Sequence, residues 1–171
     1  MQTCIFPGRF QPFHNGHLMV VQGMMKMCEN AIIVICESAD KKSSEDPFSL
    51  DERREMISAA LLSADIMDAT IVSVKDTQSD EAWAHHVLDS AGNPDEPLVW
   101  SGDENVRKIF EAKSGKAGSG SAGKIATKKI VPVPGIVGVD IRKMIASRDS
   151  QWRKKVPAGA MDTIEHILEK S

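Results

Sequence analysis

Cysteine is scarce in this 171-residue sequence, which contains only Cys4, Cys28 and Cys36. Their number is odd, they lie among apolar neighbours, and no pair shows the two-residue separation typical of zinc and redox motifs. We therefore expect neither a disulfide framework nor a zinc site. This cysteine usage favours a protein of the reducing cytoplasm.

Long hydrophobic runs and an excess of basic charge are also missing. The longest apolar runs, such as AIIVIC (31–36), span about six residues, whereas a helix needs roughly 20 to cross a bilayer. The first residues, MQTCIFPGR, lack the charged start and long apolar stretch of a secretory signal. The formal net charge of −3 leaves no general basic field for a nucleic-acid backbone. We expect no membrane span, no export and no nucleic-acid partner.

The composition that remains is typical of a globular chain, with 42% hydrophobic and 26% charged residues. Short apolar, β-branched segments alternate with stretches of helical spacing. The predicted strands are 3–7, 31–36, 69–74, 97–102 and 128–134; the predicted helices are 16–28, 50–64, 81–90, 103–113, 137–147 and 160–170. This alternation predicts an α/β fold in one domain over residues 1–171: a Rossmann-like, open, mostly parallel five-stranded sheet with helices on both faces.

Ligands of such sheets bind at the carboxyl ends of the strands. The loop 7–16 and the loops after residues 36, 74, 102 and 134 are therefore expected to converge. The first of these loops carries most of the chemistry.

Two glycines and two histidines mark the first loop, in GRFQPFHNGH (8–17). Gly8 permits a tight turn close to a ligand, and Gly16 begins a helix whose free N–H groups point at the site. His14 and His17 can both donate to a phosphate on that helix end and stabilise the charge that develops when an α-phosphate is attacked.

The histidine spacing has two other interpretations. One histidine can be a structural residue while the other lies on the surface. A zinc pair is also conceivable, although no third ligand has obvious spacing nearby and helical metal pairs usually stand four residues apart.

The stretch GRFQPFHNGH closely resembles the signature of the nucleotidyltransferase superfamily with the H-x-G-H motif. Its GRFQP form is similar to nicotinamide-mononucleotide adenylyltransferases of the archaeal type. The resemblance implies that AMP passes from ATP to nicotinamide mononucleotide, giving NAD and pyrophosphate, with Mg²⁺ held through ATP phosphates and water. It also implies self-association. The implied catalytic residues are His14, His17 and Arg142, and the implied ATP and phosphate contacts are Gly8, Arg9, Phe10, Gly16 and Gly138.

Acceptor-binding residues follow from the same resemblance. DPFSLDERREMI (46–57) is similar to the family's N-P-F-T-x-x-E-R-x-x-M-I stretch, which places Arg53 on an acceptor-binding arginine. Trp83, which follows an acidic strand-end residue, and Gly102 and Asp103 in WSGD (100–103) correspond to the nicotinamide pocket. Taken alone, Arg53 is a solvated arginine of a first helical turn and Trp83 is a core residue.

The last family motif is only partly present in GIVGVDIRKMI (135–145). Gly138 and Arg142 match, but Val137 and Val139 stand where the family has serine and threonine. Losing two hydroxyl contacts to phosphates costs on the order of 1 to 3 kcal/mol each. Backbone N–H groups replace part of that binding, and the arginine fork is the larger contribution.

A second glycine-rich stretch, GSGSAGKI (118–125), fits most of a Walker phosphate loop. Ile125 occupies the required Ser/Thr position, so we expect instead a surface loop that lends Lys116 or Lys124 to phosphates.

Two other functions remain open. One is a sibling transferase with phosphopantetheine, FMN or glycerol phosphate as acceptor. The other is a nucleotide-binding regulatory module with weak or no turnover, which Val137 and Val139 favour.

Overall fold

The structure is a computed structural model that describes residues 1–37, 41–113 and 125–171. By their contacts, the described residues fall into two compact units: unit 1 comprises Met1–Gly8, Val21–Glu37 and Asp68–Val131, and unit 2 comprises Arg9–Val20, Ser38–Met67 and Pro132–Ser171. The assignment of the whole chain to one domain stays a prediction. None of the helices in the described segments is long and apolar enough to cross a membrane.

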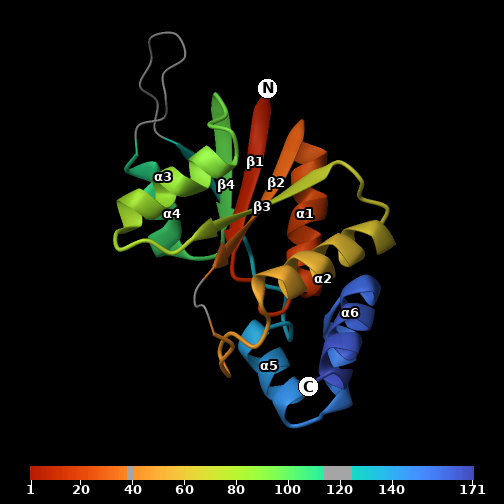
Figure 1. The fold of residues 1–171 in the computed structure, drawn as a ribbon. Helices are drawn as coiled ribbons and strands as arrows, with labels where there is room; N and C mark the ends of the chain where they lie inside the picture. The colour runs from red at the N-terminus through yellow and green to blue at the C-terminus, as the bar shows by residue number, and fades with distance from the viewer. Residues whose placement is uncertain (38–40, 114–124) are drawn as a thin grey trace. The chain divides into compact units, whose positions relative to one another are not determined.

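Unit 1 contains the sheet, whose strands run side by side in Figure 1. The strands are β1 (Gln2–Gly8), β2 (Asn30–Glu37), β3 (Ala69–Lys75), β4 (Glu96–Ser101) and β5 (Ala126–Lys129). They are all parallel, in the order β3-β2-β1-β4-β5. The predicted Rossmann-like α/β class is confirmed. The strand order reverses beside β1, and α/β sheets bind ligands at the carboxyl ends of the strands at such a point.

Helices cover both faces of this sheet, as the continuously apolar strands require. On one face, Ile5, Val34 and Val99 form a core with residues of α3 (Asp80–Ser90) and α4 (Glu104–Glu111). On the other, Trp100 lies against Gly23 of α1 (Asn15–Met27), where a Cβ atom would stand only 3.4 Å from the indole.

Unit 2 contains the helices α2 (Leu50–Ser63), α5 (Gly138–Ala146) and α6 (Ala158–Glu169) and the 3₁₀ helix η1 (Ser150–Lys155). Ser49 caps α2 in a capping box with Glu52. The helix α6 packs on α2, and Figure 1 shows the two helices next to each other at a steep angle. Their backbones approach so closely that a Cβ atom at Gly159 would overlap Ala59. The helix α5 packs on η1.

The predicted end of the fifth strand is wrong, and one short helix was missed. The fifth strand ends at Lys129 rather than residue 134, because Pro132 and Pro134 cannot donate to a ladder; Ile136 instead closes a turn onto Val133. On α1 the fully buried methionine is Met24. The helix η1 was not predicted.

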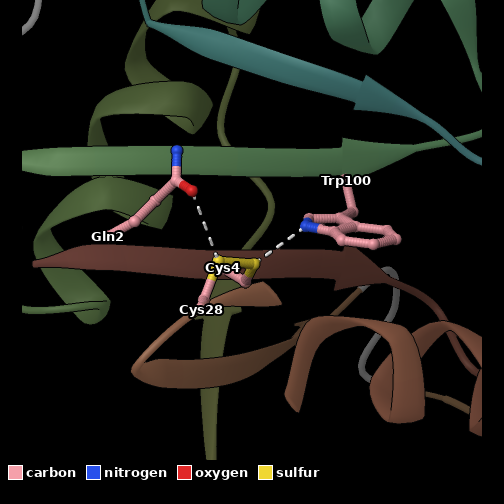
Figure 2. The surroundings of a disulfide bond; sticks show 4 residues. All are labelled: Gln2, Cys4, Cys28 and Trp100. Atoms are coloured by element: carbon pink, nitrogen blue, oxygen red, sulfur yellow. Dashed lines mark hydrogen bonds between the residues drawn. A yellow bond between two sulfur atoms is a disulfide. The ribbon is translucent and has the colours of Figure 1, made fainter. Parts of the chain in front are cut away.

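The exclusion of a disulfide is also wrong. Cys4 of β1 and Cys28, just after α1, are bonded, with their Cα atoms 5.7 Å apart (Figure 2). The indole Nε1 of Trp100 donates to Cys4 Sγ at 3.0 Å, and Gln2 Oε1 lies 4.0 Å from Cys28 Sγ. A short-range cysteine motif does not capture this pair, since the β1–α1 connection brings together residues 24 positions apart. The cytoplasmic location stays a prediction without this support.

Candidate active site

A cavity of about 470 Å³ lies within unit 2. Three segments surround it: the loop after β1 with the first turn of α1, the segment before α2, and the start of α5. Three of the five loops expected to converge therefore do so, and the loops after residues 74 and 102 belong to unit 1. The lining residues are Arg9, Phe10, Gln11, Pro12, His14, His17, Glu45, Val137, Gly138, Val139 and Arg142.

The two histidines form a stacked pair on the cavity wall. Their ring centroids are 3.6 Å apart and the planes are inclined by 13°. The backbone N–H of His14 donates to Nδ1 of His17 at 3.1 Å, and the backbone N–H of His17 donates to Nδ1 of His14 at 3.3 Å. A ring nitrogen that accepts carries no proton, so each neutral ring holds its proton on Nε2. The pair is thereby prepared as two neutral hydrogen-bond donors.

Burial keeps both rings neutral. It lowers the pKa of His14 from 6.5 to about 4. Burial, and secondarily the charge of His14, lowers the pKa of His17 well below 6.5. Phe10 packs edge-on against His17, with centroids 4.9 Å apart, and the ring of Phe13 lies 5.5 Å away. This aromatic contact covers part of the His17 ring and fixes its orientation.

Gly16 leaves room for the stacked pair at the start of α1. A Cβ atom at this position would lie 2.9 Å from Cε1 and 3.0 Å from Nδ1 of His14. The His14 ring is held between this backbone and His17, so it has little space to move aside. Gly16 is thus needed for close approach, rather than for a special backbone angle.

The loop that carries Phe10 is held by side chains of unit 2. Phe10 has a φ of 54°, which costs energy in a bulky residue. The Gln11 amide exchanges two hydrogen bonds of 2.9 Å with the backbone of Phe48. Arg53 donates from Nη1 to Arg9 O at 2.8 Å and from Nε to Ser49 O at 3.2 Å.

Arg53 is therefore neither solvated nor exposed, since only 3% of it is accessible. In this structure its guanidinium holds the first loop, which lines the cavity, through the carbonyl of Arg9. Arg53 itself is not among the lining residues. Its contact with an acceptor nucleotide stays a prediction.

The start of α5 presents backbone rather than hydroxyl groups to the cavity. Val137 is the N-cap residue and makes no side-chain capping bond, whereas Ser49, Ser79 and Asp103 each cap their helices. Val137 and Val139 are 46% and 47% exposed. The first N–H groups of α5 therefore remain available to an anion.

The charged side chains of the cavity carry both signs. Arg142 lines it and donates from Nη1 to Gln11 O at 2.9 Å, which links α5 to the first loop. Arg9 is exposed and lines it too. Glu45 adds a carboxylate that the sequence reasoning missed, because the polar segment before α2 has no distinctive motif.

The remaining predicted residues lie in unit 1. Gly8 ends β1, opposite Ile35. Trp83 packs against Phe110 with centroids 5.5 Å apart and joins the core of the sheet, while Asp103 caps α4 through Asn105 N at 2.8 Å. Gly102 is exposed just after β4. Their roles in acceptor binding stay predictions, and the glycine-rich stretch with Lys116 and Lys124 lies outside the described residues.

The described residues contain no group of three His, Cys, Asp or Glu side chains arranged to hold a metal ion. The donor set at the cavity is instead one carboxylate, Glu45, beside backbone and imidazole groups. Oxygen donors and waters suit Mg²⁺, which commonly binds through substrate phosphates with few protein ligands. The residues present fit an ion that arrives with a triphosphate.

A parallel sheet with its order reversed beside β1, together with a cavity lined by paired histidines, arginines and a helix start, is typical of nucleotide-binding α/β enzymes. The pattern of the cytidylyltransferase-like family matches residues 5–144, and the chain belongs to this nucleotidyltransferase family.

Its curated relatives include nicotinamide-nucleotide adenylyltransferases of archaea. The enzyme of Haloarcula marismortui is 29% identical over 160 residues, covering 94% of this chain and 79% of the relative. That of Picrophilus torridus is 29% identical over 161 residues, covering 94% and 88%.

Solved structures share the fold. A bifunctional NMN adenylyltransferase/ADP ribose pyrophosphatase from Francisella tularensis, complexed with AMP and a manganese ion, matches with a TM-score of 0.77 at 18% identity. The match covers 98% of this chain and 49% of that one. The chain thus spans about half the length of this solved structure.

Proposed function

We propose that the protein is an adenylyltransferase that transfers AMP from ATP to nicotinamide mononucleotide, forming NAD and pyrophosphate. The stacked, neutral His14–His17 pair on the wall of a cavity that also receives Arg9 and Arg142 carries this proposal. The named activity of the archaeal relatives supports the choice of acceptor.

In the proposed reaction, an oxygen of the acceptor's 5′-phosphate forms a bond to the α-phosphorus of ATP. The bond from that phosphorus to the bridging oxygen breaks, and pyrophosphate leaves with the electron pair. The attacking phosphate is already ionised at neutral pH, so no protein base is required. Catalysis then comes from alignment and from stabilising the charge that develops.

Each group on the cavity wall has a part in this step. The Nε2–H groups of His14 and His17 donate to oxygens of the α-phosphate. Because both rings are neutral before the substrate binds, they act as fixed dipoles rather than as acids. Arg142, already oriented by Gln11 O, binds phosphate oxygens in pairs, and the first N–H groups of α5 add to this.

Mg²⁺ bound with ATP would neutralise charge on the triphosphate, and Glu45 is the cavity carboxylate positioned to hold one of its waters. We propose that the enzyme is homo-oligomeric, as the family resemblance implies, and that it is cytoplasmic.

A regulatory module that binds nucleotides with weak or no turnover is the second candidate. The exposed Val137 and Val139 at the start of α5 favour it, because they offer no hydroxyl to the phosphates.

An acceptor panel separates these functions. The protein is incubated with ATP, Mg²⁺ and one of nicotinamide mononucleotide, nicotinate mononucleotide, phosphopantetheine or FMN, with a parallel CTP and glycerol phosphate reaction. Released pyrophosphate and product mass are measured. NAD as the main product supports the proposal. Turnover with another acceptor alone, or nucleotide binding without any pyrophosphate, rejects it.

The histidines are tested by His17→Ala. We expect turnover to fall by about 10² to 10³-fold, the usual loss for one preorganised donor. His86→Ala, on the exposed side of α3, is the matched control and should retain full activity. Thermal unfolding of both variants establishes that they are folded. An unchanged rate in folded His17→Ala would exclude His17 from the reaction.

A further inference from the structure

Lys155 lies at the end of η1, beside the turn that leads into α5. It is half-buried, and its Nζ lies 3.7 Å from the place of a Cβ atom at Gly135. Gly135 has a φ of 80°, and the ammonium lies on the side where a side chain at this position would stand. Lys155 was not among the residues predicted from the sequence to bind phosphate.

The end of η1 is fixed against the starts of two helices that line the cavity. Asn15 Nδ2 donates to the carbonyl oxygen of Lys154 at 3.2 Å, which holds η1 at the first turn of α1. Ile136 Cγ2 lies 3.9 Å from the place of a Cβ atom at Gly16, so the turn before α5 also borders α1. Lys155 is not itself among the residues that line the cavity, but these contacts place it beside residues that adjoin the lining residues His14 and Val137 in the chain.

The charge of Lys155 is uncompensated. Arg153 of the same helix pairs with Glu165, but Lys155 makes no ion pair or hydrogen bond with the residues that the structure describes. Its ammonium lies beside the turn at Gly135, three residues before the start of α5, and a helix dipole disfavours a cation at that end of the helix. A half-buried cation in such a place is stabilised when an anion binds beside it.

We propose that Lys155 binds the outer phosphates of the nucleoside triphosphate, at the end that leaves as pyrophosphate. This inference rests on the proposed function for its substrate. The start of α5 lines the cavity together with the histidine pair, and Gly135 comes three residues before this helix. With the α-phosphate at the histidines, we expect the β- and γ-phosphates, rather than the single phosphate of the mononucleotide acceptor, to reach Lys155.

The test compares Lys155→Gln with Lys154→Gln. Lys154 is the adjacent, exposed lysine, and its backbone bond to Asn15 survives the substitution. Calorimetry measures the Kd for inorganic tripolyphosphate and for AMP, and kinetics measure KM for ATP and for nicotinamide mononucleotide. We expect Lys155→Gln to raise the Kd for tripolyphosphate and the KM for ATP about tenfold, the effect of one charge-assisted contact. Binding of AMP and the KM for the mononucleotide should stay within about twofold.

Lys155→Arg should restore most of the affinity, and Lys154→Gln should behave as the wild type. Equal effects of the two glutamine variants, an equal loss for AMP, or a wild type that binds no tripolyphosphate would overturn the inference. Lys155-dependent binding of tripolyphosphate without turnover of any acceptor would reject the proposed function and leave the inference standing. NAD formation with an unchanged KM for ATP in Lys155→Gln would support the proposed function and reject the inference.

Discussion

The stacked histidine pair requires that residue 16 has no side chain. A methyl group at this position would lie 2.9 Å from the His14 ring, which cannot move away because it is stacked on His17. We therefore expect Gly16→Ala to break the stack. We expect turnover to fall by about 10²-fold, as a misplaced reacting group costs this much.

Gly23→Ala in the same helix is the control, because its Cβ atom would make ordinary contact with Trp100 and alanine is the better helix former. Equal activity of the Gly16 and Gly23 variants would show that the stack is not required.

The depressed pKa of His14 also makes stability depend on pH. The folded state holds this pKa at about 4, while the unfolded chain titrates near 6.5. The unfolded state therefore binds the proton first, and the stabilisation present above pH 6.5 is lost as the pH falls toward 4. The full pKa shift corresponds to about 3 kcal/mol in the free energy of unfolding.

Urea unfolding at pH 7.5 and 4.5 measures this difference. His14→Gln should lose less stability on acidification than the wild type or the exposed-site variant His86→Gln. Identical pH dependence of all three proteins would contradict the assignment.

The sequence predicted many of the residues that line the cavity, but not the contacts that hold the cavity wall in place. Arg9, Phe10, His14, His17, Gly138 and Arg142 were all expected near phosphate, and all line the cavity. The contacts of Arg53 with two carbonyl groups could not be predicted, because they depend on where the first loop lies relative to α2. Glu45 was missed for the same reason: tertiary placement, not local pattern, brings it to the cavity.

At the level of elements, the alternation of apolar strands and helical stripes was sufficient for the order and type of nearly every element. The failures have local physical causes. Prolines end β5 early, and the disulfide joins two elements whose contact no short motif records. Cysteine pairs in a β–α unit are visible only when the packing of the helix on its strand is known.

The disulfide fixes the end of α1 to β1. In the chain-entropy description, closing a loop of this size stabilises the folded state by about 3 kcal/mol. We expect the reductant dithiothreitol to lower the urea midpoint of the wild type accordingly, and to leave a Cys4→Ala/Cys28→Ala variant unchanged.

Thiol labelling gives an independent measurement of the same bond. The denatured, unreduced protein should take up one label, at Cys36, and three labels after reduction. Three labels without reduction would show that Cys4 and Cys28 are not joined.

At the level of the whole molecule, neither compact unit is a continuous piece of chain. The chain passes between them after residues 8, 20, 37, 67 and 131, and one passage lies inside α1. Each unit consists of three segments that are joined only through the other unit. We therefore expect both units to unfold in one cooperative transition.

The tryptophans allow each unit to be followed separately. Trp83 and Trp100 lie in unit 1 and Trp152 lies in unit 2. Trp152→Phe therefore reports on unit 1, and Trp83→Phe/Trp100→Phe reports on unit 2. Because each variant changes stability, the fluorescence transition of each is compared with its own circular dichroism transition. Coincident midpoints within both variants are expected, and they would mean that the cavity cannot open by unfolding of unit 2 alone. A fluorescence midpoint separated from the circular dichroism midpoint in either variant would show that the units are independent folding domains.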